Sequence, residues 1–429
     1  MKGMNDMNHH DRSILKATAL ALLVLTGTLA QAQDFSYSAF GTIGGAISNQ
    51  DYRYQRFVDS DGTFMRDSVL GAQVDVQFTP EWSATIQGKL APSARNDQDW
   101  DLTASWAFAS WRPNNDWLVR AGKMRIPLYL SSENLDVGQS YDFARLPTEM
   151  YSIAPTTDVI GLYVTRNWAL GQSDLSLDVY SGEAKVWVRM NTRDTGTLFS
   201  DYKTQVSGSV LTWRAEDTML RFGAHHAVTR PDGGPLNPVS TQSVPTPFGP
   251  IYAPSGTTPK IRNDIITVGI DQKLAGNWRI MFEAERNIQH DTDLGANTAG
   301  GYIAILKSMD KWTPYVSASV LKTVGAPARQ HEVLSQSSVP DVPSTPYLQP
   351  LVDRINASQR IFADSVPFYD QHSLAIGTSY AITPQSKLKA EWLHTWVGKG
   401  SAMIDSPSGG PAVSNQGIDV FSLSYNFAY

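Results

Sequence analysis

The chain has 429 residues, with 35 basic and 41 acidic side chains and no cysteine, so disulfide bonds contribute nothing to its stability. The net charge of −6 argues against nucleic acid as a partner, because binding phosphates requires a basic surface. Charged residues make up 18% of the chain, fewer than the ~25% of an average soluble domain. No zinc, calcium or phosphate-loop signature occurs, so we expect no metal and no cofactor.

Residues 1–32 predict a cleaved secretory signal peptide. Three basic residues precede a short apolar run at 17–29, and Ala30-Gln31-Ala32 supplies the small residues of a cleavage site. A membrane anchor or a buried helix is the alternative, but this run is shorter than the ~20 residues that span a bilayer. We therefore expect an exported chain, 33–429, of net charge −7 and organised as a single domain.

The dominant pattern is an alternation of apolar and polar residues with a period of two, which predicts strands with two unlike faces. In the segment 70–78, for example, Leu70, Val74 and Phe78 alternate with polar residues. Sixteen segments carry the pattern: 35–48, 70–78, 82–90, 100–111, 117–124, 158–169, 173–182, 205–214, 219–228, 264–274, 278–286, 300–307, 312–323, 371–382, 387–397 and 417–429. An even number of antiparallel strands is typical of bacterial outer-membrane barrels.

The connections between these segments alternate in length. Seven are tight turns, and eight are long: 49–67, 91–99, 125–157, 183–204, 229–263, 287–299, 324–370 and 398–416. This asymmetry predicts an all-β transmembrane barrel with short periplasmic turns and long extracellular loops. The loops 229–263 and 324–370 are rich in Pro, Ser, Thr and Gly, so we expect little regular structure in them.

Aromatic residues and the last strand support the barrel. Aromatics gather beside the tight turns, as a membrane–water boundary would select: Phe78, Trp82, Trp111, Trp117, Trp168, Trp213, Trp278 and Trp312. Trp100, Trp392 and Trp396 predict a second girdle near the loops. The segment 417–429 alternates to its final residue, Tyr429. It is similar to the C-terminal strand that the outer-membrane barrel assembly machinery reads, although most such strands end in Phe.

Together these features resemble the Gram-negative outer-membrane porin superfamily over the whole mature chain. The resemblance implies a 16-stranded antiparallel barrel, usually a homotrimer, that contacts outer-membrane lipids and passes ions and small hydrophilic solutes by passive diffusion. In such porins the third long loop folds inward and narrows the channel. By strand count, that loop is the insert 125–157.

The charges of the insert fit a constriction. The resemblance opposes acidic groups on the loop to basic groups on the barrel wall, and a field across a narrow aqueous ring orients solutes and sets ion preference. The predicted acidic side is Glu133, Asp136, Asp142 and Glu149, and the predicted basic side is Arg66, Lys89, Arg120, Arg125 and Arg145. Alternatively these charges simply solvate a loop or pair locally, as Arg145 and Asp142 could. Inward acids such as Asp178 favour a weak cation preference.

Two other functions share part of the pattern. An outer-membrane hydrolase needs a serine activated by a positioned histidine; only His225 and His394 occupy good strand positions, and neither has a neighbouring serine motif. We therefore expect no catalytic residues and no enzymatic activity. A non-pore adhesin or ligand-binding β-protein would share the alternation but not the girdles or the terminal strand.

Overall fold

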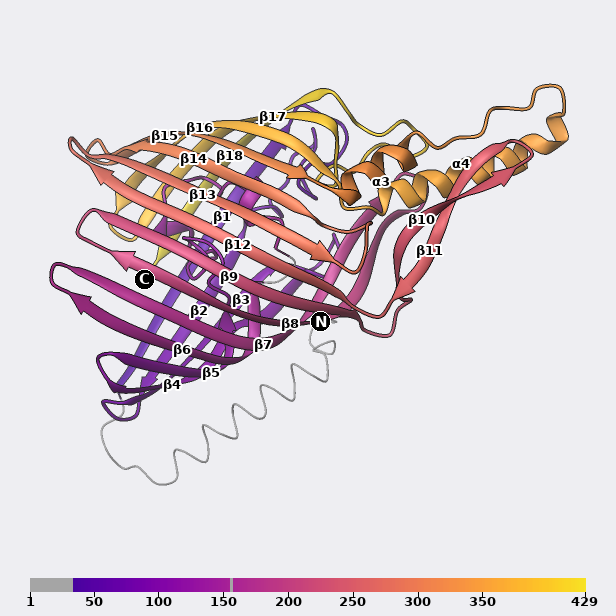
Figure 1. The fold of residues 1–429 in the computed structure, drawn as a ribbon. Coiled ribbons are helices and arrows are strands. Elements are labelled where there is room, and N and C mark those ends of the chain that lie inside the picture. The colour runs from indigo at the N-terminus through magenta and orange to yellow at the C-terminus, as the bar shows by residue number, and fades with distance from the viewer. Residues whose placement is uncertain (1–33, 155–156) are drawn as a thin grey trace, which may run out of the picture.

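The computed structural model describes residues 34–154 and 157–429, so the predicted signal peptide at 1–32 lies outside the described residues. Sixteen antiparallel strands form one closed barrel, shown in Figure 1. The first strand, β1 (Asp34–Ser48), pairs with the last, β18 (Gln416–Ala428), and this pairing closes the cylinder. The predicted fold class, an all-β barrel of sixteen antiparallel strands, is confirmed.

The other strands of the barrel follow the predicted segments closely. They are β2 (Val69–Gln77), β3 (Trp82–Pro92), β4 (Trp100–Asn114), β5 (Trp117–Arg125), β6 (Asp158–Leu170), β7 (Ser173–Thr192), β8 (Gly196–Arg214), β9 (Thr218–Pro231), β12 (Ile261–Leu274), β13 (Trp278–His290), β14 (Thr298–Lys307), β15 (Trp312–Thr323), β16 (Tyr369–Thr383) and β17 (Ser386–Ser401). Each strand pairs with its neighbour in the chain, apart from the insertion of a hairpin between β9 and β12.

The alternation in sequence becomes an inside and an outside of the wall. In β18, Ser422, Ser424 and Asn426 are buried and face inward, whereas Phe421 and Leu423 are 55% and 57% exposed on the outer surface. Successive side chains of a strand point to opposite faces, so a period of two leaves one apolar and one polar face. The barrel is therefore apolar outside and largely polar inside.

Tryptophan side chains lie on the outer face beside the tight turns, as predicted, but Phe78 is only 8% exposed because it packs with Val76 and Ala84. Trp82 and Trp111 stack with their ring centroids 6.0 Å apart, and Trp312 lies 4.7 Å from Tyr380. Each of these tryptophans is at least 40% exposed, which a core tryptophan would not be. Near the opposite end, Trp100 and Trp396 are exposed to a similar degree.

Three long connections are more ordered than predicted. The segment 183–204 is not a loop but the continuation of β7 and β8, which pair with each other as far as Thr192 and Gly196. Their alternation continues beyond the predicted ends, as buried Ala184 and Val186 show. The loop 229–263 contains a hairpin, β10 (Asn237–Thr246) with β11 (Gly249–Thr258). A two-stranded ribbon has two free edges, so it accommodates prolines at positions without a ladder donor.

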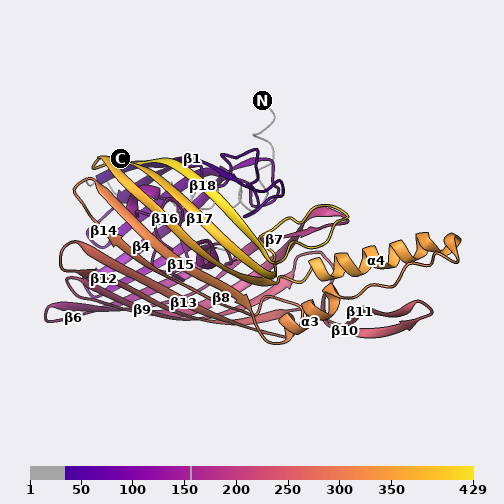
Figure 2. The same cartoon turned by 90° about the horizontal axis from the view of Figure 1, so that it is seen from above.

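The loop 324–370 forms helices, which the sequence reading missed. They are α3 (Ala326–Ser335), η2 (Pro346–Leu348) and α4 (Gln349–Asp364), and prolines occupy the first turn of each, where a missing N–H costs nothing. Figure 2 shows that α4 and the β10–β11 hairpin project beyond the loop end of the barrel. None of the helices among the described residues combines the length and hydropathy that crossing a bilayer requires.

We predict that Gly122→Val destabilises the barrel by about 1–3 kcal/mol or more, because it overpacks a β4–β5 contact. Gly122 has a φ of +134°, and a Cβ there would lie 2.2 Å from the carbonyl oxygen of Ala107. Unheated gel electrophoresis of refolded protein and the urea midpoint would measure the effect. The matched control is Gly234→Val, since a Cβ at Gly234 meets no atom within 4 Å. Equal folding of both variants would contradict the prediction.

Candidate functional site

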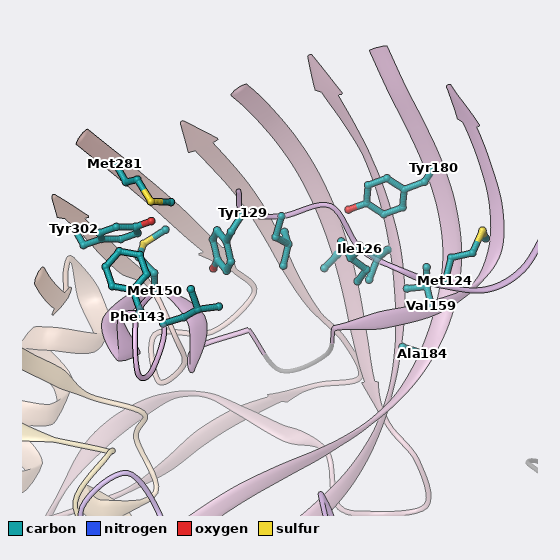
Figure 3. Packing of buried hydrophobic residues seen from close by; sticks show 14 of the residues in the cluster. Met124, Ile126, Tyr129, Phe143, Met150, Val159, Tyr180, Ala184, Met281 and Tyr302 are labelled. Carbon is teal, nitrogen blue, oxygen red and sulfur yellow. The ribbon is translucent and has the colours of Figure 1, made fainter. Parts of the chain in front are cut away.

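The insert between β5 and β6 crosses the interior of the barrel. The backbone N–H of Ile126 donates to the carbonyl of Thr157 at 2.9 Å, so both ends of the insert leave the wall together. Figure 3 shows the chain running from Met124 and Ile126, near Tyr180, to Tyr129, Phe143 and Met150, near Met281 and Tyr302 on the opposite wall. The short helices η1 (Gly138–Ser140) and α2 (Thr148–Tyr151) lie within it.

Two buried glutamates of β13 hold the start of the insert. Glu283 accepts a hydrogen bond from the backbone N–H of Leu130 at 2.7 Å and others from the hydroxyls of Tyr151 and Tyr302. Glu285 accepts one from the hydroxyl of Tyr129. The glutamates are 2% and 7% exposed. Buried carboxyl groups require such donors, so these contacts fix the position of the insert.

Glu149, in α2, points into the wall rather than into open space. It is 1% exposed and accepts hydrogen bonds from Ser319 Oγ at 2.7 Å and Gln371 Nε2 at 2.8 Å, and a third from Ser373. The donors come from β15 and β16. Glu149 therefore anchors the end of the insert.

Lys389 of β17 holds the middle of the insert. Its Nζ donates to the carbonyl oxygens of Gly138 and Phe143, at 2.6 and 2.9 Å, and lies 4.1 Å from the ring centroid of Tyr141. Ammonium and aromatic ring attract each other, and the attraction grows when both are desolvated. Lys389 is only 1% exposed, so it serves the insert and not the solvent.

Asp136 of the insert binds two cations of the wall. Its carboxylate oxygens lie 2.9 Å from Lys89 Nζ on β3 and 2.5 Å from Arg125 Nη2 at the end of β5. Burial opposes ionisation of Asp136, but the two cations together hold the pKa of its carboxyl group well below the usual value. Asp136 is therefore ionised across the physiological range.

Two further ion pairs hold the insert. Asp142 accepts from Lys387 Nζ and Ser379 Oγ, both at 2.8 Å; burial opposes its ionisation, yet these contacts lower the pKa of Asp142. Arg145 binds Asp67, which also binds the buried Arg66. The two arginines lower the pKa of Asp67 despite its burial. Arg145 thus pairs with the first long loop, not with Asp142, the local partner that the sequence allowed.

The structure brings together only some of the predicted constriction residues. Lys89, Arg125 and Asp136 form one cluster, while Arg66 and Arg145 meet at Asp67 instead. Glu133 is exposed within the barrel and interacts electrostatically with Tyr163 and Asp178 of the β6–β7 wall. Arg120 lies over the ring of Tyr163, 4.2 Å from its centroid, and lines a cavity of about 510 Å³. Of the predicted charges, Glu133 and Arg120 are therefore the pair without an ionic partner in the described residues.

Several residues of the site were not predicted from the sequence. They are Asp67, Glu283, Glu285, Lys387, Lys389 and Arg221 of β9, which donates to the carbonyl oxygen of Tyr129. Each occupies an inward position or a loop end, but nothing local distinguishes it from other alternating polar residues. Their roles depend on which part of the insert each one meets, and strand period alone does not contain that information.

The histidines do not form the arrangement that a serine hydrolase needs. Across residues 34–154 and 157–429, the hydrogen bonds of histidine rings go to tyrosine or aspartate: His225 to Tyr180, His394 to Asp419, and His226 and His290 to Asp264. His394 lies on the outer face, beside Trp396. Nor does the described part of the chain gather three or more potential metal ligands.

We predict that Asp136→Asn lowers the free energy of unfolding by about 3 kcal/mol, because it leaves Arg125 buried with a weakened partner. Since the pKa of Asp136 is depressed below the ordinary value of an aspartate, the contribution should be full at pH 5 and 7 and shrink as the pH falls below about 4. Urea unfolding of both proteins at pH 7, 5 and 3 measures this difference.

The matched control is Asp116→Asn, which removes a surface partner of Arg166 and should cost less than about 1 kcal/mol. If the difference in the free energy of unfolding between wild type and Asp136→Asn grew on acidification, the pKa of Asp136 would be raised in the folded protein and not lowered.

Comparisons with known proteins support the fold alone. Neither a protein-family model nor a curated protein matches the chain. Among solved structures, OmpT of Vibrio cholerae, an outer membrane protein, matches with a TM-score of 0.50, 10% identity, and 94% and 99% coverage of this chain and of that one. Its variant lacking loop L8 gives a TM-score of 0.51, 10% identity, and 93% and 100% coverage. An anion-selective porin from Comamonas acidovorans matches with a TM-score of 0.49 and 10% identity, and the match covers 93% of this chain and 100% of that one. The two OmpT structures thus show that the chain has the barrel fold of that outer membrane protein.

Proposed function

We propose that this protein is a porin of the Gram-negative outer membrane: a water-filled channel for passive diffusion of ions and small hydrophilic solutes, narrowed by the insert 125–157. The observation that carries the proposal is the insert itself, which is anchored inside a closed sixteen-stranded cylinder. Barrels of this size enclose an aqueous channel rather than a packed core. A segment held across that channel sets its narrowest width and its charge.

The outer surface supports a membrane location. Ile303, Ile305 and Val316 are 45–48% exposed, so apolar side chains face outward where water would be unfavourable. Trp278 and Trp312 flank this band beside the tight turns, as interfacial aromatics do. In the proposed arrangement, outer-membrane lipids cover the band, the tight turns face the periplasm, and the long loops face outward.

Two partners belong to the same proposal. A homotrimer belongs to the proposal, and the exposed small residues Ala72, Ala109 and Ala121 of β2, β4 and β5 would let a second wall approach closely there. The assembly machinery of the outer membrane would read β18, whose outer face carries Phe421, Leu423 and Tyr425 and which closes the barrel. The proposed function is non-enzymatic, and residues 33–429 form its single domain.

The charges of the constriction take two roles in this proposal. Asp136, Asp142 and Glu149, with Lys89, Arg66, Arg125 and Arg145, hold the insert to the wall through the contacts above. Glu133 and Arg120 both lie near Tyr163 and have no ionic partner in the described residues, so in this proposal they act on passing ions. Because Glu133 is the exposed carboxylate of the insert, we expect a weak cation preference.

Single-channel recording in planar bilayers tests the channel. Deleting residues 131–143 should raise the conductance roughly twofold and admit larger solutes, because the open cross-section widens. Deleting residues 241–254, the tip of the β10–β11 hairpin, is the matched control and should leave conductance unchanged. Wild-type protein that folds but conducts no ions would refute the proposed function, and an unchanged deletion variant would refute the constriction.

The ion preference has its own test. Glu133→Gln should lower the cation-to-anion permeability ratio roughly twofold, as read from the reversal potential in a KCl gradient. Asp341→Asn removes the same charge from the projecting arm near α4 and should not change the ratio, because charges beyond the ~10 Å screening length have little effect. Equal shifts in both variants would count against a role for Glu133.

A further inference from the structure

One row of inward-facing residues crosses five neighbouring strands of the wall. Through the strand pairing, Arg120 of β5 lies next to Tyr163 of β6, Tyr163 next to Tyr180 of β7, and Tyr180 next to Gly208 of β8 and then His225 of β9. Tyr163 and Tyr180 stack with centroids 5.9 Å apart, and the Tyr180 hydroxyl lies 2.8 Å from His225 Nδ1. We call these residues, with Asp178 and Arg221, the polar row.

The polar row is assembled closely. A Cβ at Gly208 would lie 2.5 Å from His225 Nδ1 and 2.9 Å from the Tyr180 hydroxyl, so a larger residue would prevent their contact. Arg221 donates to the carbonyl oxygen of Tyr129 at 2.8 Å, which joins the row to the insert. Asp178 accepts from Thr165 at 2.7 Å. The row therefore has a fixed geometry on which a solute could bind without reorganising the wall.

Polar atoms in this row lack protein partners. In the described part of the chain, the buried atoms without a hydrogen-bond partner include Arg120 Nε, Tyr163 Oη, Arg221 Nε and His225 Nε2. Tyr163, His225 and Arg221 are only 2%, 4% and 8% exposed. Unsatisfied buried polar atoms are rare in native proteins, and four of them on one wall mark a polar region beside the more accessible Arg120, Asp178 and Glu133.

Charges of both signs surround the same tyrosine. The Tyr163 hydroxyl interacts electrostatically with Asp178, Glu133, Arg120 and Arg221. Of these residues only Arg120 lines the cavity of about 510 Å³, which lies toward the tight turns and is otherwise lined by Phe108, Ser110, Arg112, Leu118 and residues of the β2–β3 turn. Near Tyr163, an anion would be repelled by the carboxylates of Asp178 and Glu133, and a cation would be repelled by the two guanidinium groups. A solute that carries both charges matches all of them.

We propose that the polar row is a binding site for small zwitterions, solutes with a carboxylate and an ammonium group a few atoms apart, such as amino acids and dipeptides. Arg120 and Arg221 hold the carboxylate, while Glu133 of the insert and Asp178 hold the ammonium group. Charge-assisted hydrogen bonds of this kind are about twice as strong as neutral ones. This inference rests on the proposed channel, because the solute must reach the row through the lumen.

The test is inhibition of single-channel KCl current by three matched solutes at pH 7. Glycylglycine carries both charges, N-acetylglycine only the carboxylate, and glycinamide only the ammonium group. Glycylglycine should reduce the current at a concentration about tenfold lower than either of the others, the ratio expected when one charged contact is lost. Equal inhibition by all three, or stronger inhibition by a singly charged solute, would overturn the inference.

Two variants assign the charges to their partners. Glu133→Gln should abolish the preference for glycylglycine over N-acetylglycine, and Arg120→Gln the preference over glycinamide, each leaving the other preference in place. Arg279→Gln is the control, because Arg279 is already paired with Asp271 and lies outside the polar row. Migration on unheated gels confirms that each variant is folded before recording.

The outcomes separate the two proposals. A conducting channel without any glycylglycine preference overturns the zwitterion site and leaves the proposed channel intact. A folded protein that does not conduct refutes the channel, and the site falls with it. Loss of both preferences in Arg279→Gln would show that any lumenal arginine suffices, which also overturns the assignment to the polar row.

Discussion

A closed sheet of sixteen strands encloses more space than its inward side chains can fill, and this constraint governs the rest of the structure. Strand pairing, including that of β1 with β18, satisfies the backbone hydrogen-bonding groups of the wall. The interior then needs either water or another segment of chain. The insert supplies that segment, and it brings polar backbone groups and charges into a partly buried space where each must find a partner.

The wall provides those partners over most of the circumference. Glu283, Lys389 and Lys89 come from three well-separated strands, β13, β17 and β3, and all bind the insert. The insert therefore behaves as part of the wall and not as a mobile loop, because moving it would leave buried charges unpaired. Glu133 and Arg120, near Tyr163, are the exception, since neither has an ionic partner in the described residues.

The loop end of the barrel is held by a second set of ion pairs. Arg189, on the part of β7 beyond the predicted strand, binds Asp97 and Asp405 from two other loops. Arg193 binds Asp364 at the end of α4, and Arg360 of α4 binds Asp194 in the β7–β8 turn. Together these pairs link the long hairpin to its neighbours. They stabilise a defined entrance above the insert, where several partners share one charge network.

The barrel, the strand count, the tryptophan girdles and the position of the insert could be predicted from the residue pattern alone. These features depend on local periodicity, which survives in any window of ~10 residues because a strand places alternate side chains on opposite faces. The sequence also shows the charged residues of the insert, from Glu133 to Glu149. The prediction of loops at 183–204 and 324–370 was wrong. In the first segment β7 and β8 continue to pair, and in the second, prolines begin helices despite a composition typical of loops.

Only the tertiary structure decided what each charge does. Asp142 and Arg145 are three residues apart, yet one binds Lys387 of β17 and the other Asp67 of the first long loop. The polar row likewise consists of residues from β5, β6, β7 and β9 that share no motif. Its existence follows from strand register and from the absence of a side chain at Gly208, and register is a relation between strands that no single segment encodes.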